Sequence, residues 1–404
     1  MNTENFLNGY KEDVKNFLAT IIKYPSTVNN EVELINFLEN FFKDLGYNVE
    51  RHPIPFALSY DKEFTKYPEF KSFKDRDNLV LKIKGTGEGR SIIINAHMDV
   101  VPAGNWDNAF NPEIKGDLVY GRGAVDDKGQ IAVIYTLLRL IKEKNFKPRG
   151  DIIIELVIDE EVGGNGTLSL LREGIKADGA IVLECADMEI HPANRGVLWF
   201  EANIKGKPVH MGKKYEGISA IDKGIEFINL LYDYEKQLQK SKHPLFKKHK
   251  YPAQVNIGKM NGGSFPSMVP DWCKIEGGIG FLPDKSIEIV KSDIDKILEN
   301  KASKWLKDNI ELSYKALHND AFAISPSHPL VTTLAESFKK ANYKTEINGW
   351  IVSCDARLFQ TIANIPVVVT GAGKLALAHS DNEHIDINEV LKMAEILYEF
   401  LQRW

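Results

Sequence analysis

Short, continuous runs of isoleucine, valine and leucine are the feature that most constrains how this chain can fold. Four such runs lie at residues 78–84, 91–97, 151–158 and 179–184, and a helical pattern spans residues 128–144. A strand that is apolar on both faces is typical of a sheet that helices cover on both sides. The sequence therefore predicts an α/β fold with a mixed, mostly parallel sheet.

The pattern changes after about Val197, where a second set of elements begins. Their order is strand, helix, strand, strand, helix, which indicates a small α+β domain inserted into the first one. The α/β pattern resumes near Pro329. We therefore expect residues 1–197 and 319–404 to form one discontinuous domain and residues 198–318 to form the inserted domain. The other expected elements are N-terminal helices at residues 5–23 and 30–45, strands at 198–204, 253–260 and 272–281, and helices at 217–240 and 286–306.

The charge balance gives no support to a nucleic-acid or membrane partner. The chain has 51 Lys and Arg against 56 Asp and Glu, so it lacks the basic footprint of a nucleic-acid-binding protein. Apolar runs are too short to span a membrane, and the first residues do not resemble a signal peptide. The three cysteines, Cys185, Cys273 and Cys354, are far apart, which argues against a disulfide framework. We expect a cytoplasmic globular protein.

Acids and histidines stand where the expected strands end. His97 ends one strand and Asp99 follows two residues later, a spacing that suits a metal-bound imidazole oriented by a carboxylate. Three consecutive acids, from Asp159 to Glu161, end another strand. They repel one another unless a cation neutralises part of their charge. Because α/β sheets bind ligands at the carboxyl ends of their strands, these positions mark a candidate site.

Further residues complete this set. Asp126 and Asp127 close a Gly-rich turn, Glu184 ends the strand at residues 179–184, and His379 lies near the C-terminus. Each of these residues, taken singly, also fits a structural or solvated role. Together, two histidines and three carboxylates match the ligands of paired zinc ions, with one carboxylate bridging. We therefore predict two divalent ions per chain.

Four motifs carry a resemblance to a known family. They are His97-Met-Asp-Val-Val-Pro, Gly-Arg-Gly-Ala-Val-Asp126-Asp-Lys-Gly, Asp-Glu160-Glu-Val-Gly and Ala-His379-Ser-Asp-Asn-Glu. In their order and spacing they resemble the acetylornithine deacetylase / succinyl-diaminopimelate desuccinylase / aminoacylase family of co-catalytic zinc metallopeptidases. The similarity runs from about Val14 to the C-terminus. It implies a zinc-peptidase-like catalytic domain with an inserted lid and dimerisation domain.

The resemblance also assigns roles to the candidate ligands. It implies that one zinc ion is held by His97 and Glu184. The other is held by Glu161 and His379, and Asp126 bridges the two. Co²⁺ or Mn²⁺ are expected substitutes for Zn²⁺. The family often has a cis peptide bond after the bridging aspartate, which we expect here as well.

Other residues acquire expected roles in the reaction. Asp99 would support the first histidine. Glu160 would be the general base that takes a proton from a metal-bridging water and delivers it to the leaving amine. His210 resembles the family's lid histidine, which stabilises the oxyanion from the partner subunit of a homodimer. Asn256 and Arg357 would contact the substrate.

The inserted domain and its neighbourhood also depart from the family pattern. Ser267-Met-Val-Pro stands where Asn-Val-Ile-Pro is common, and Cys354 replaces a usual threonine. Gly280 occupies a position that is often arginine. Loss of that arginine removes a cationic fork for a substrate carboxylate. The departures affect the choice of substrate and leave the metal chemistry unchanged.

The expected function is removal of the acyl group from an N-acyl amino acid or N-acyl diamino acid by a dizinc-bridging water. A dipeptidase or exopeptidase acting on short peptides with the same metals is the close alternative. A catalytically silent metal-binding homologue would have no chemical need for Glu160 beside a metal ligand. A nucleotide-binding protein is disfavoured because the Gly-rich turn lacks both a phosphate-gripping Lys-Ser/Thr and a dinucleotide fingerprint.

Overall fold

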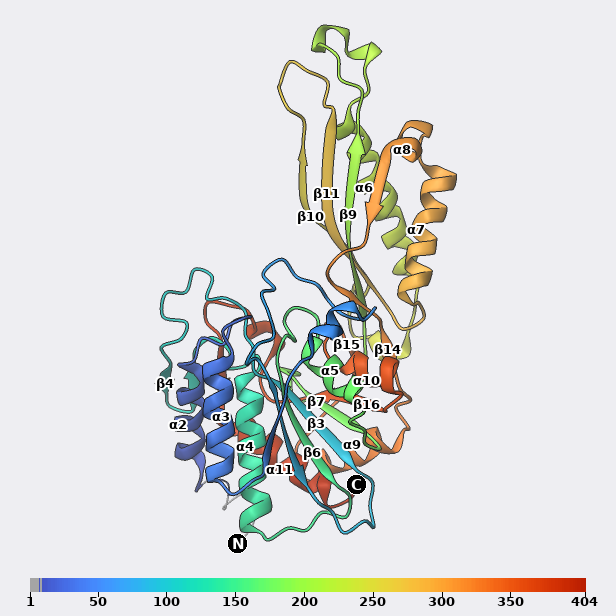
Figure 1. Ribbon diagram of the computed structural model, residues 1–404. Coiled ribbons are helices and arrows are strands. Elements are labelled where there is room, and N and C mark those ends of the chain that lie inside the picture. Colours follow the sequence, from blue (N-terminus) through green and yellow to red (C-terminus); the bar gives the residue numbers. More distant parts are fainter. Residues whose placement is uncertain (1–6, 8) are drawn as a thin grey trace. The chain divides into compact units, whose positions relative to one another are not determined.

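The chain divides into two compact units in the computed structural model, which describes residues 7 and 9–404 (Figure 1). Unit 1 comprises Met1–Ala193, Ile324–Trp350 and Cys354–Trp404, and unit 2 comprises Asn194–Ala323 and Ile351–Ser353. The expected inserted domain, residues 198–318, therefore lies within unit 2. Of the expected first helix, residues 5, 6 and 8 lie outside the described part of the chain.

A mixed sheet forms the centre of unit 1. Its strands follow the order β1-β2-β6-β3-β7-β16-β8. Neighbours from β6 to β16 run parallel, whereas β1, β2 and β8 pair antiparallel with their neighbours. Every residue of β3, β6 and β7 is buried, so the predicted α/β fold is confirmed. The strands are β1 (Val49–His52), β2 (Asn78–Ile83), β3 (Ile92–His97), β6 (Ile152–Val157), β7 (Ala180–Leu183), β8 (Ile190–Asn194) and β16 (Val367–Thr370).

Helices flank this sheet on two sides, with α2, α3 and α4 on one side and α5 and α10 on the other (Figure 1). Among the described residues, every helix is too short or too polar to cross a membrane. The helices are α2 (Lys11–Ile22), α3 (Val32–Asp44), α4 (Lys128–Glu143), α5 (Asn165–Glu173), α9 (Pro329–Lys340), α10 (Ala356–Ala363) and α11 (Ile387–Leu401), and the smaller strands are β4 (Glu113–Lys115), β5 (Leu118–Tyr120), β15 (Ile347–Trp350) and β17 (His384–Asp386).

Unit 2 is an antiparallel sheet with helices packed against it (Figure 1). The strand order is β10-β11-β9-β12, and β13 also pairs with β9. Alternate residues of β9 are buried, Leu198 and Phe200 among them, as expected of a sheet with one covered face. The elements are β9 (Gly196–Lys205), α6 (Ala220–Leu238), β10 (Val255–Gly262), β11 (Trp272–Phe281), α7 (Ile287–Lys301), α8 (Lys304–Asn309), β12 (Ile310–Ser313), β13 (His318–Asn319) and β14 (Phe322–Ala323).

The helix predicted at residues 286–306 is interrupted, which corrects the sequence interpretation. Ala302 is extended, and the Ser303 hydroxyl accepts a hydrogen bond from the Leu306 N–H at 3.4 Å. Glu226, from α6, accepts the Ser303 N–H at 2.6 Å. A serine cap and a tertiary contact thus begin a new helix where local periodicity predicts continuation.

The parallel strands β6, β3 and β7 are neighbours, so their carboxyl ends lie together at one edge of the sheet. The residues that follow or end these strands are Ile158 to Glu161, His97 and Glu184. This edge is where the sequence places its candidate ligands.

Candidate metal centre

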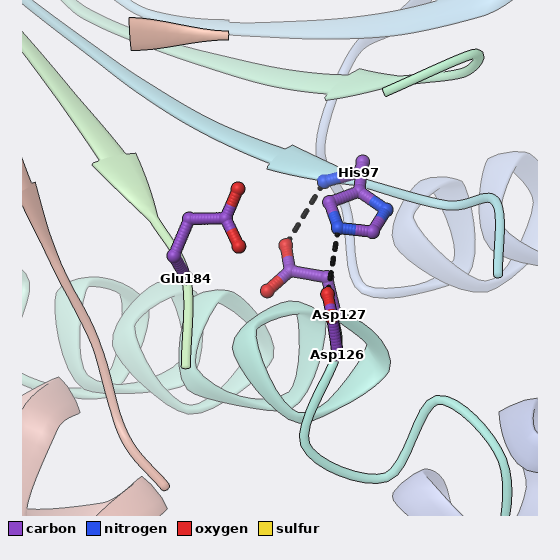
Figure 2. A group of neighbouring side chains, drawn as sticks. All are labelled: His97, Asp126, Asp127 and Glu184. Carbon is purple, nitrogen blue, oxygen red and sulfur yellow. Dashed lines mark hydrogen bonds and ion pairs between the residues drawn. The ribbon is translucent and has the colours of Figure 1, made fainter. Parts of the chain in front are cut away.

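Four of the side chains that could hold a metal ion converge at the end of the sheet (Figure 2). They are His97, Asp126, Asp127 and Glu184, whose nearest donor atoms all lie within 4.8 Å of one another. His97 ends β3, Glu184 follows β7, and the two aspartates precede α4. All four residues are buried.

A second group contains Asp126, Glu161 and His379. Asp126 belongs to both groups and faces each with a different oxygen. Its Oδ1 lies 3.0 Å from His97 Nε2, and its Oδ2 lies 3.1 Å from His379 Nε2. His379 Nε2 is also 3.2 Å from Glu161 Oε1. Asp126 therefore contacts both groups, with one carboxylate oxygen directed to each.

The hydrogen bonds of His97 define its tautomer. Its Nδ1 lies 2.9 Å from the main-chain carbonyl oxygen of Asp99, and a carbonyl can only accept, so Nδ1 carries the proton. Nε2 faces the acceptor Oδ1 of Asp126, and with Nδ1 protonated it is the ring nitrogen that would offer its lone pair to a metal ion placed between the two residues. The carboxylate of Asp99 is farther from Nδ1, at 3.6 Å. Its oxygens accept the N–H groups of Glu160 and Glu161 instead, at 3.2 and 3.1 Å.

Burial and mutual repulsion make this cluster electrostatically costly without a cation. Burial, followed by neighbouring carboxylates, raises the pKa of Glu184 well above its ordinary value. Burial also raises the pKa of Asp127 well above its ordinary value. Hydrogen bonds with Asp126 and Glu161 raise the pKa of His379 to about 10. The acids thus attract positive charge strongly at this point.

The donor set fits divalent metal ions. Two imidazole nitrogens and several carboxylate oxygens are ligands that zinc accepts. Oδ1 of Asp127 is buried and lacks a hydrogen-bond partner within the described chain. His379 is about half exposed, at 51% of its side chain, so this side of the second group is open to solvent.

A buried ion pair supports the segment that carries Asp126. Glu383 Oε1 accepts the N–H groups of Val125 and Asp126 at 3.0 and 3.2 Å. Its Oε2 lies 2.6 Å from Arg122 Nη1, which also donates to the Ser380 carbonyl oxygen. Glu383 and Arg122 are both buried, and they tie the Asp126 segment to the residue that follows His379. The peptide bond from Asp126 to Asp127 is cis, as expected.

We expect Glu383→Gln to lower the free energy of unfolding by about 3–5 kcal/mol, the usual cost of leaving a buried charge unpaired. The amide oxygen can still accept both main-chain N–H groups, but the amide NH2 group would face the donor Nη1 of Arg122, which also loses its counter-charge. Urea unfolding measures the change. Glu399→Gln, which removes the partner of the part-exposed Arg403, is the control and should change stability by less than about 1 kcal/mol. Equal effects of the two substitutions would contradict this role of Glu383.

Several other residues named from the sequence lie elsewhere or are already engaged. His210 and Asn256 belong to unit 2. Arg357 is only 1% exposed, and its Nη2 donates to the Gly163 carbonyl oxygen at 3.2 Å. A substrate contact would require Arg357 to exchange that partner, so its assignment stays a prediction. Asp127 joins the cluster, although the sequence argument noted it only as part of an acidic pair.

Comparison with known proteins places the chain in a family. The model of peptidase family M20/M25/M40 matches residues 93–403. An N-formyl-4-amino-5-aminomethyl-2-methylpyrimidine deformylase from Bacillus subtilis is 27% identical and covers 98% of this chain and 95% of its own length. A probable succinyl-diaminopimelate desuccinylase from Staphylococcus aureus is 28% identical over 96% of each protein. The crystal structure of a Staphylococcus aureus tripeptidase has a TM-score of 0.76 at 22% identity, covering 97% of this chain and 98% of that one.

The fold and the buried imidazole and carboxylate donors define a metal-dependent hydrolase that acts on amide bonds. More narrowly, the chain belongs to peptidase family M20/M25/M40. The resemblance read from the four sequence motifs is thereby confirmed.

Proposed function

We propose that this protein uses two divalent metal ions to remove the acyl group from an N-acyl amino acid or N-acyl diamino acid. The proposal rests on the position of Asp126, whose two carboxylate oxygens lie 3.0 and 3.1 Å from two different histidines. A single tetrahedral zinc site needs four ligands. The two groups of side chains together offer more than four donors, and they have one carboxylate in common.

The residues around the cluster then have distinct tasks. His97 and Glu184 would hold one ion, and Glu161 and His379 the other. Bound divalent ions would polarise a carbonyl group and lower the pKa of water. Glu160 would accept the proton and return it to the leaving amine. Burial, with a smaller contribution from neighbouring carboxylates, raises the pKa of Glu160 well above its ordinary value, which helps this carboxylate to hold a proton.

Removal of an acyl group is favoured over peptide cleavage by the names of two relatives. Both the deformylase and the probable desuccinylase are named for removing an acyl group, and each covers almost the whole chain. The tripeptidase resemblance supports the fold alone. Dipeptidase or exopeptidase activity with the same residues remains the second candidate.

A cation beside Gly280 supports a substrate that carries a carboxylate. A Cβ atom on Gly280 would lie 3.0 Å from Nη1 of Arg195, so this guanidinium occupies the space that a side chain at position 280 would fill. Arg195 Nη1 donates a long hydrogen bond of 3.5 Å to the Pro252 carbonyl oxygen. We infer that Arg195 supplies the fork that the sequence pattern lacks at position 280.

A homodimer formed through unit 2 is the assembly that this function favours. His210 follows β9, whereas the chain enters unit 2 at Asn194, just before the opposite end of that strand. Ten residues of β9 span about 30 Å of extended chain. His210 therefore lies beyond the end of β9 that is farther from Asn194, and we infer that it serves the metal cluster of a partner subunit.

A matched substrate screen tests the proposed function. Zinc-loaded protein is assayed against N-acetyl and N-succinyl amino acids, their carboxamide counterparts and unblocked dipeptides. We expect the highest kcat/KM for acylated amino acids with a free carboxylate, and lower values for the carboxamides because Arg195 then lacks an anionic partner. Faster cleavage of dipeptides would establish the second candidate instead.

A further inference from the structure

The general-base candidate Glu160 follows a residue with an unusual backbone conformation. Asp159 comes just after β6 and has φ of 62°, in the left-handed region that residues other than glycine rarely adopt. Such a conformation persists where the surrounding structure holds it. The Gly164 N–H donates to the Asp159 carbonyl oxygen at 2.7 Å, so the chain turns sharply through Glu160 and Glu161.

Three side chains hold the Asp159 carboxylate, which is fully buried. Arg76 Nη2 donates to Oδ1 at 2.5 Å. The Tyr67 hydroxyl lies 3.1 and 3.0 Å from the two oxygens. Asn165 Nδ2 donates to Oδ2 at 3.2 Å. Asp159 is therefore fully engaged, which disfavours it as a replacement for Glu160 as the base.

Arg76 is itself fixed from several directions. A guanidinium has five N–H donors, and each of those of Arg76 has an acceptor. Nε and Nη2 form a bidentate pair with Glu31 at 2.7 and 2.5 Å. Nη1 donates to the Tyr67 hydroxyl at 3.3 Å and to the Ser72 carbonyl oxygen at 3.2 Å. Arg76 is 2% exposed, so these contacts are shielded from water and resist exchange.

Hydrogen bonds connect the turn that follows Asp159 to the metal cluster. The N–H groups of Glu160 and Glu161 donate to the two oxygens of Asp99, and the carbonyl oxygen of Asp99 orients His97. A rotation at Asp159 would break the two amide contacts and redirect both glutamates. The contacts made by Arg76 and Tyr67 thus affect the positions of the two glutamates through the backbone.

We propose that Arg76 and Tyr67 are positioning residues that fix Asp159 and thereby the direction in which Glu160 enters the active site. The inference rests on the proposed role of Glu160 as general base. Neither Arg76 nor Tyr67 touches the metal ligands in this arrangement. Their contribution comes from geometry, since a displacement of about 1 Å in a catalytic group can cost about a hundredfold in rate.

Tyr67→Phe is the most discriminating variant, because it removes one hydroxyl and keeps the buried ring. Arg76→Met would leave the buried carboxylates of Glu31 and Asp159 without their positively charged partner and could prevent folding. We expect Tyr67→Phe to lower kcat about tenfold, with KM and metal content unchanged. Asp159→Asn should have a similar or larger effect, and the double variant should be no slower than Asp159→Asn alone.

Amide hydrogen exchange supplies a readout that does not depend on activity. We expect the N–H groups of Glu160 and Glu161 to exchange faster in Tyr67→Phe than in the native protein, because the turn opens more often. Arg172→Met is the matched control. This variant removes another bidentate arginine–carboxylate pair, the one that Arg172 forms with Asp61 at 2.7 and 3.1 Å. It should leave both kcat and the exchange of these two N–H groups unchanged.

Unchanged exchange in Tyr67→Phe would overturn the inference that the hydroxyl holds the turn. Faster exchange with native kcat would overturn its link to catalysis. A double variant slower than Asp159→Asn by the full Tyr67→Phe factor would show that the tyrosine acts independently of Asp159. If Glu160→Gln itself kept native kcat, the role of Glu160 would fail, and that result is separate from the exchange measurement.

Discussion

Glu160→Gln is expected to lower kcat by about 10²- to 10⁴-fold, the range for loss of a general base, while the protein retains its bound metal. The amide cannot accept and return a proton, yet it has nearly the same size. The main-chain N–H of residue 160 can still donate to Asp99 Oδ1, so the turn should keep its shape. Steady-state kinetics and elemental analysis measure the two quantities.

Glu161→Gln is the matched control for this prediction. Glu161 lies in the same turn, but its Oε1 faces His379 at 3.2 Å. The amide in this variant should lower the affinity of the second position for metal, so added zinc should restore part of the lost activity. Added zinc should not restore Glu160→Gln. Near-native kcat for Glu160→Gln would remove the assignment of the base.

His210→Ala is expected to lower kcat by about 10²- to 10³-fold, the scale for one oxyanion donor, with metal content unchanged. His210 is exposed, and its Nδ1 accepts the Gly212 N–H at 3.2 Å. The neutral ring therefore carries its proton on Nε2. That N–H is a hydrogen-bond donor that the contact with Gly212 does not occupy, and stabilisation of an oxyanion requires such a donor.

Mixing two inactive variants tests whether His210 acts from the partner subunit. A hybrid dimer of His210→Ala and Glu160→Gln would contain one site with both native residues if the histidine acts in trans. Activity should then partly return after subunit exchange. Exchange without recovery would assign His210 to its own chain or to no catalytic role. Met211 and Tyr215, which follow His210 in the chain, are exposed, and so is Phe265, whose carbonyl oxygen accepts the Met268 N–H.

Local patterns predict the strands that carry the candidate site. Continuous apolar runs identify β2, β3, β6 and β7. The point where each run ends also identifies the polar residue at the end of the strand. The structure then brings His97, Asp126 and Glu184 within ligand distance. The carboxyl ends of parallel strands share one sheet edge, so this convergence is a consequence of topology.

The residues that support the site cannot be predicted from such patterns. Arg76 contacts Glu31 and Asp159 across separations of 45 and 83 residues, and periodicity carries no information about these pairs. Glu383 contacts Asp126 from 257 residues away. The unusual conformation of Asp159 is likewise invisible in composition. The sequence shows only that Arg76, Arg122 and Glu383 lie outside the expected helices and strands, and charged residues in such positions are usually solvated.

Metal titration of the metal-free protein tests the central claim most directly. Protein stripped with a chelator is supplied with Zn²⁺ in steps, with Co²⁺ and Mn²⁺ in parallel, while hydrolysis of the best substrate from the screen is followed. The account predicts negligible hydrolysis without metal and a rise that saturates at two ions per chain. Full hydrolysis by the metal-free protein, or saturation at one ion with full activity, would contradict it.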